Sequence, residues 1–150
     1  YRSSRGLGDV YKRQTICEAD HLFATRLWQN NSKVHFDINA REDKKRLIYG
    51  GHIISLVRAL SFNGLENAQL IVGINGGTHA NPAFAEDTIY CWSEVLEKID
   101  LNVRNIAALR LRSVGTKEKN HSMKVKSDDG KYLPTVVLDF DYWVLVPKEL

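Results

Sequence analysis

The sequence is poor in cysteine and has no long apolar run. Its two cysteines among 150 residues, Cys17 and Cys91, are far apart, which favours structural thiols in a reducing compartment over a disulfide or a metal site. The longest apolar stretch, 136–146, is interrupted by two aspartates and is shorter than the roughly 18 residues that cross a membrane. No apolar segment follows the basic start, so a secretory signal is not predicted. We therefore expect a cytoplasmic protein that makes no contact with a membrane.

Most of the chain also lacks a net charge. The whole sequence has a formal charge of +3, but residues 1–14 contain four Lys or Arg residues and one Asp. The remaining residues hold equal numbers of acidic and basic side chains, so the excess charge belongs to this leader alone. A protein that binds nucleic acid concentrates positive charge on its surface. We therefore expect no nucleic-acid partner.

The leader has a specific resemblance of its own. The stretch "SRGLGDVYKRQ", residues 4–14, resembles the translation of a transposase adapter that is used to prepare sequencing libraries. This resemblance implies a non-native leader over residues 1–14, followed over residues 15–150 by one domain that is truncated at its N-terminus. The alternative is a disordered native arm.

Two helices are predicted in the first half of the body. The stretch "EADHLFATRLWQ", residues 18–29, has helical periodicity and acidic residues in its first turn. A polar loop over 30–43 separates it from a more apolar helix over 51–62. The first helix is expected to bury Ala19, Leu22, Phe23 and Leu27, and the second Ile53, Leu56, Val57 and Leu60.

The second half of the body favours strands. A short β-rich stretch covers 68–76, and longer stretches with alternating polarity cover 88–99, 105–117 and 134–147. A polar excursion with an Asp129-Gly130 turn interrupts them. Three long strands after one buried helix predict an α+β fold, in which an antiparallel sheet wraps around a central helix. No internal repeat and no second domain are predicted.

Three features could carry chemistry. His35 is a lone histidine in the loop between the helices. The stretch "YGGH", residues 49–52, comes directly before the buried helix, where exposed N–H groups can stabilise an oxyanion. Asp139 and Asp141 share one face of the last strand, which favours a solvated face over a catalytic carboxylate pair. Each signal alone is weak, because most histidines and glycine turns are structural.

Together these features resemble the MaoC-like, (R)-specific enoyl-CoA hydratase branch of the hotdog fold. That branch has a "T-x-T-E-A-D" strand end, an "Asp-x-Asn-Pro-x-His" motif, and a glycine that opens the central helix. The strand end matches residues 15–20, the motif histidine falls on His35 and the glycine falls on Gly51. The sequence departs from the motif where its acid falls on Asn30, its asparagine on Ser32 and its proline on Lys33. The resemblance therefore implies a hydratase site without the usual aspartate.

Longer blocks resemble one group within this branch, the mesaconyl-CoA hydratases, also called β-methylmalyl-CoA dehydratases. The blocks include "RLIYGGHIISLVRALSFNGL" and "VVLDFDYWVLVP", and the resemblance extends over about 15–147. It implies the C-terminal half of a double-hotdog enzyme that reversibly hydrates mesaconyl-CoA to β-methylmalyl-CoA. The implied partners are the acyl-CoA substrate and a second hotdog domain, either from a homodimer or from a missing N-terminal half.

The resemblance also implies roles for individual residues. His35 is expected to activate water or transfer a proton, and the Gly51 N–H to stabilise the thioester enolate. Asn30 is expected to orient water, because an amide cannot act as a base. The expected substrate-binding residues are Tyr49, Gly50, His52 and Asp37, where Asp37 is also an alternative source of the missing carboxylate. No metal and no organic cofactor are expected beyond the CoA thioester of the substrate.

Other functions fit the same fold. A broader (R)-specific enoyl-CoA hydratase would share the site, and a non-catalytic half of a double-hotdog enzyme would share only the architecture. A thioesterase usually carries an acidic residue on the central helix, and 51–62 contains no Asp or Glu. His35 and the glycine turn favour the catalytic reading.

Overall fold

The computed structural model describes residues 12–62, 64–68, 70–119 and 122–148. They form five strands, two α-helices and two short 3-10 helices. In chain order these elements are β1 (Lys12–Thr15), α1 (Glu18–Leu27), η1 (Lys33–His35), η2 (Ile38–Ala40), α2 (Gly50–Leu60), β2 (Leu70–Thr78), β3 (Thr88–Val103), β4 (Ile106–Thr116) and β5 (Val136–Pro147).

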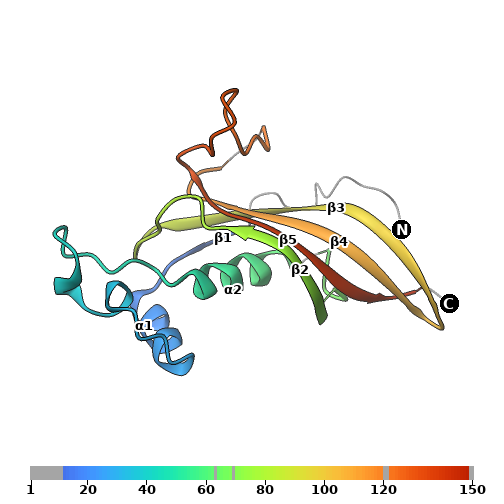
Figure 1. Cartoon of the computed structure of the whole chain (residues 1–150), viewed down its shortest axis with the longest axis horizontal. Coiled ribbons are helices and arrows are strands. Elements are labelled where there is room, and N and C mark those ends of the chain that lie inside the picture. Colours follow the sequence, from blue (N-terminus) through green and yellow to red (C-terminus); the bar gives the residue numbers. More distant parts are fainter. Residues whose placement is uncertain (1–11, 63, 69, 120–121, 149–150) are drawn as a thin grey trace.

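The strands form one antiparallel sheet in the order β1-β3-β4-β5-β2. The sheet is strongly curved, and α2 lies within its concave side (Figure 1). Helix α2 contacts β1, β3, β4 and β5. The predicted α+β architecture, an antiparallel sheet around a central helix, is therefore confirmed.

Helix α2 is the centre of the main core. Its buried face consists of Ile53, Leu56 and Val57, three of the four residues expected from the helical spacing. Val57 packs so closely on β4 that a Cβ atom at Gly115 would lie 2.7 Å from its Cγ2 atom. A glycine at this point therefore allows the helix to rest directly on the sheet.

The expected apolar face of α1 is wrong. The buried residues of this helix are His21 and Thr25, which lie one turn apart. Phe23 and Leu27 are instead 61% and 63% exposed, and the adjoining Trp28 is 68% exposed. The reason is tertiary, because α1 turns a polar face toward the start of α2 and directs its large apolar side chains outward.

The convex face of the sheet carries ion pairs between neighbouring strands. Arg112 makes a bidentate contact with Asp139, and Arg110 makes a similar one with Asp141. Burial raises the pKa of Asp139, but hydrogen bonds and charge from Arg112 and Tyr132 outweigh it, so the net pKa is lowered. Both aspartates thus act as structural partners of arginines on the face opposite α2.

Residues 1–11 lie outside the described residues. Strand β1 begins at Lys12 and pairs with β3, from Lys12 opposite Cys91 to Thr15 opposite Thr88. The boundary between leader and domain after Gln14 stays a prediction. Over the described ranges, no helix is long and apolar enough to cross a membrane.

Candidate active site

The first turn of α2 presents free backbone donors. The N-cap residue Tyr49 has extended backbone angles, and its carbonyl accepts the His52 N–H at 2.9 Å. Among the described residues, no acceptor is bonded to the N–H groups of Gly50 and Gly51. Such donors, together with the positive end of the helix dipole, favour a negatively charged oxygen.

Two rings leave no room for side chains at these glycines. A Cβ atom at Gly51 would lie 2.6 Å from the Tyr49 ring, and one at Gly50 would lie 2.5 Å from the His79 ring. The turn therefore requires glycine for close approach and not for an unusual backbone angle. His79 directly follows β2, so the end of this edge strand also reaches the start of α2.

One hydrogen bond fixes how His35 carries its proton. Its Nδ1 atom lies 2.8 Å from the Leu47 carbonyl oxygen. A carbonyl can only accept, so Nδ1 must be the protonated nitrogen and Nε2 keeps a lone pair in the neutral ring. The His35 and Tyr49 rings are 5.8 Å apart between centroids, with edge-to-face geometry. His35 is thus a half-buried imidazole beside the first turn of α2.

A second histidine at this place was not predicted. His21 is fully buried, and its ring centroid lies 6.3 Å from that of His35 and 5.9 Å from that of His52. Burial lowers the pKa of His21 to about 4, and the neighbouring His52 and His35 add to this effect. Burial also lowers the pKa of His52, against the influence of Asp20.

Four of the five histidines therefore gather at the start of α2, although they are spread over 59 positions of the chain. The sequence offers no local signal for His21 or His79, since neither belongs to a motif. His21 lies within a stretch that has the spacing of an ordinary amphipathic helix, so the sequence alone indicates no functional role for it.

Asn30 and Asp37 make local contacts. The Asn30 Oδ1 atom accepts the Ser32 N–H at 3.0 Å, and the Asp37 Oδ1 atom accepts the Asn39 N–H at 2.8 Å. No hydrogen bond or ion pair joins either side chain to His35 in the described part of the chain. The Asn30 amide nitrogen remains available as a donor, since its oxygen closes the turn.

Arg46 braces the loop that carries these residues. It donates to Glu18 of α1 at 2.7 Å and to the Phe36 carbonyl at 2.8 Å. This arginine holds α1 and the loop together immediately before the glycine turn.

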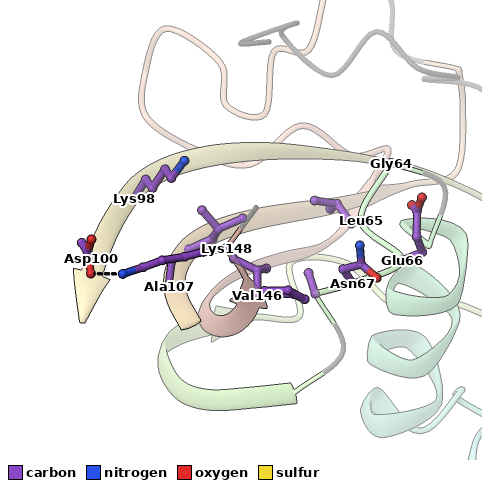
Figure 2. A pocket seen from close by; sticks show the side chains of 12 residues that line it. Gly64, Leu65, Glu66, Asn67, Lys98, Asp100, Ala107, Val146 and Lys148 are labelled. Atoms are coloured by element: carbon purple, nitrogen blue, oxygen red, sulfur yellow. Dashed lines mark hydrogen bonds and ion pairs between the residues drawn. The ribbon is translucent and has the colours of Figure 1, made fainter. Parts of the chain in front are cut away.

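A cavity of about 610 Å³ lies at the other end of α2. Its walls come from residues 64–68, which follow α2, and from the ends of β3, β4 and β5. Figure 2 shows Lys148 reaching across it to Asp100, with which it forms an ion pair. The cavity contains none of the histidines. Within the described ranges, no cluster of three or more His, Cys, Asp or Glu side chains could hold a metal ion.

The geometry described above is that of a hotdog domain. No protein-family model matches the chain. A structure assigned to the MaoC-domain dehydratases, from Chloroflexus aurantiacus, superposes with a TM-score of 0.88 at 49% identity, covering 94% of this chain and 42% of that one. A double-hotdog protein from Mycobacterium tuberculosis, at 22% identity and a TM-score of 0.59, has the same fold over 91% of this chain and 37% of its own.

Two curated relatives are more specific. Mesaconyl-CoA hydratase from Cereibacter sphaeroides is 58% identical over 134 residues, which is 89% of this chain and 39% of that protein. β-Methylmalyl-CoA dehydratase from Chloroflexus aurantiacus is 52% identical over 139 residues, which is 89% of this chain and 40% of that protein. The predicted resemblance to this group is confirmed, and the chain spans about 40% of the length of these relatives.

Proposed function

We propose that this chain carries the site of a hydro-lyase that reversibly adds water to the C2–C3 double bond of mesaconyl-CoA, giving β-methylmalyl-CoA. The observation that carries the proposal is the lone pair on His35 Nε2, fixed by the Leu47 carbonyl, beside the free N–H groups that open α2. The names of two relatives above 50% identity support this substrate.

The proposed reaction needs a base and a site for negative charge. His35 Nε2 takes a proton from water while the water oxygen bonds to the carbon β to the thioester. The double-bond electrons then move toward the thioester oxygen, where the Gly51 N–H stabilises the enolate. His35 returns the proton to the α-carbon, so the balance is the addition of one water molecule.

The remaining residues take supporting roles in this proposal. Asn30 orients the water through its amide nitrogen, and Gly50, Tyr49 and His52 line the acyl group. Asp37 lies on the same loop and is proposed as a further substrate-binding residue. Oriented donors alone can polarise a thioester, so the proposal includes no metal and no organic cofactor.

Replacing His35 tests this assignment. We expect His35→Ala to lower kcat for mesaconyl-CoA hydration by about 10²-fold or more, because a positioned acid–base group contributes about that much. His35→Asn is the matched control for folding, because its amide nitrogen is as many bonds from the backbone as Nδ1 and can donate to the Leu47 carbonyl, but it cannot accept a proton. Equal activity of wild type and His35→Ala would contradict the proposal.

The same assay, run with a second substrate, distinguishes a mesaconyl-CoA hydratase from a broader (R)-specific enoyl-CoA hydratase. Crotonyl-CoA lacks the α-methyl branch of mesaconyl-CoA and has a methyl group in place of its free carboxylate. A higher kcat/KM for crotonyl-CoA would favour a general (R)-specific enoyl-CoA hydratase. Retained activity without His35 would favour a site in another hotdog domain.

A second hotdog domain is the proposed partner. Strand β2 is one edge of the sheet, and its side chains Leu70, Val72 and Ile74 are more than half exposed. Helix α1 separately exposes the apolar side chains of Phe23 and Leu27. The greater length of the relatives supports a partner of the same fold, and a second copy can take its place when this chain is alone.

A further inference from the structure

The contacts of His21 are unusual for a buried side chain. The ring is fully buried on α1, 28 positions before the residue that it binds. Its Nε2 atom accepts the backbone N–H of Tyr49 at 2.8 Å. Tyr49 is the N-cap of α2, so this contact joins the two helices at the point where the glycine turn begins.

The same hydrogen bond determines the form of the ring. An accepting Nε2 has no proton, so the neutral ring carries its proton on Nδ1. Within the described residues, that Nδ1 has no hydrogen-bond partner. A buried donor without a partner is destabilising, and an apolar side chain of similar size would avoid the cost. Packing alone therefore does not explain a histidine here.

We propose that His21 is a positioning residue, which holds the Tyr49 N–H and thereby sets the direction of the Gly51 N–H at the start of α2. Its link to catalysis rests on the function proposed above. Tyr49 is two residues before Gly51, and its ring also covers Gly51, so a shift of the Tyr49 backbone moves the expected oxyanion donor directly.

This role requires an uncharged ring, because an imidazolium would direct a second N–H at the Tyr49 N–H. The groups that face His21 are Glu18 on its own helix, His35 on η1, Arg46 before the turn and His52 on α2. Only Glu18 favours the charged form, and it is already bonded to Arg46. The surroundings thus keep His21 neutral as the contact demands.

Amide exchange of the isotopically labelled chain tests the contact without any substrate. We expect His21→Phe, which keeps a ring but no acceptor, to raise the exchange rate of the Tyr49 amide about tenfold or more and to shift the Gly51 amide resonance. His21→Gln retains an acceptor and should stay within about threefold of wild type. Thr25→Val is the matched control, because it changes a buried polar residue on the same face of α1. Unchanged Tyr49 exchange in a folded His21→Phe variant would overturn the proposal.

The wild-type ring supplies a test that needs no variant. The NMR chemical shifts of the His21 ring nitrogens should be those of the tautomer protonated at Nδ1 at neutral pH. If the spectrum shows the proton on Nε2, the contact does not exist in solution and the proposal fails, even if His21→Phe does not fold.

Kinetics connect the contact to the reaction. We expect His21→Phe to lower kcat for mesaconyl-CoA about tenfold or more with KM within about threefold, and His21→Gln to restore it. Full kcat in a variant that has lost Tyr49 protection would overturn the catalytic role. A wild-type chain without hydratase activity would instead contradict the proposed function, while the exchange data would still decide where His21 acts.

Discussion

At the scale of single residues, two histidines do opposite things with the same tautomer. In both rings Nδ1 carries the proton. His35 donates it to the Leu47 carbonyl and leaves Nε2 open, whereas His21 uses Nε2 to hold a backbone N–H. Only His35 therefore has a free lone pair for water, although the rings are neighbours.

The backbone donor at residue 51 can be tested with two variants that share one steric defect. Any Cβ atom at this position meets the Tyr49 ring, so Gly51→Ala and Gly51→Pro share this clash, to which proline adds only the contacts of its ring with Gly50. Only proline removes the N–H, and it is tolerated in the first turn of a helix. We expect kcat of Gly51→Pro to be about 10²-fold below that of Gly51→Ala, as measured by mesaconyl-CoA hydration. Equal rates would exclude this N–H as the oxyanion donor.

The lowered pKa of His21 predicts how stability depends on pH. Between its usual value of 6.5 and about 4, the unfolded chain binds a proton that the folded chain does not, so the free energy of unfolding falls as the pH falls. The shift corresponds to about 3 kcal/mol. Urea unfolding at pH 7 and pH 4 should show that His21→Gln loses about this part of the difference, while the contributions of His52 and His79 remain. An identical pH dependence in both proteins would contradict a neutral, buried His21.

The sequence carried only part of the information about the site. His35 and the glycine turn were predictable, because a histidine in a polar loop and two glycines before an apolar helix are local signals. His21 was not, because its environment is created by residues 14 to 31 positions away. Its role depends on the angle between two helices, and no local periodicity encodes that angle.

At the scale of elements, the placement of α2 on the sheet depends on one close contact. A Cβ atom at Gly115 would lie 2.7 Å from Val57 and 3.3 Å from Val137, both buried. We expect Gly115→Ala to lower the free energy of unfolding by about 1–3 kcal/mol, because it overpacks the core. Gly76→Ala in β2 is the control, since nothing lies within 4 Å of its added methyl group. Chemical denaturation measures both, and equal stabilities would contradict this account of the packing.

The two helices show which elements can be predicted. The apolar spacing of α2 identified three of its buried residues because the sheet surrounds it and selects one face. Helix α1 lies at the edge of the fold, where its apolar residues face outward. Its existence was predictable, but its orientation was not, because hydrophobic spacing indicates an apolar face without saying what covers it.

At the scale of the whole molecule, the uncovered β2 edge predicts self-association of the isolated chain. We expect sedimentation to show a dimer whose fraction rises with concentration. Ile74→Lys, at a residue 65% exposed on β2, should shift the equilibrium toward monomer. Val103→Lys, at an exposed residue on the far end of β3, is the control and should leave the dimer unchanged. A monomer at all concentrations, or equal effects of both variants, would contradict an interface at β2.

The architecture was more predictable than the site. Strand alternation after a buried helix sufficed for the antiparallel sheet, but not for the strand order or for the full length of β3, whose last ten residues are exposed. Exposed strand residues lose the alternation on which the prediction depends. The place of β3 between β1 and β4 follows from long-range pairing, which no single segment contains.

The unequal lengths of β3 and α2 set a limit on what the domain can hold. At about 3.3 Å per residue the 16 residues of β3 span about 50 Å, whereas the 11 residues of α2 at about 1.5 Å per residue span about 16 Å. The helix thus underlies about a third of the strand. The histidines lie at the first end of α2 and the 610 Å³ cavity lies at its other end, so the histidine cluster and the cavity are about one helix length apart. A short acyl group cannot occupy both, and any single ligand that does must be an extended molecule.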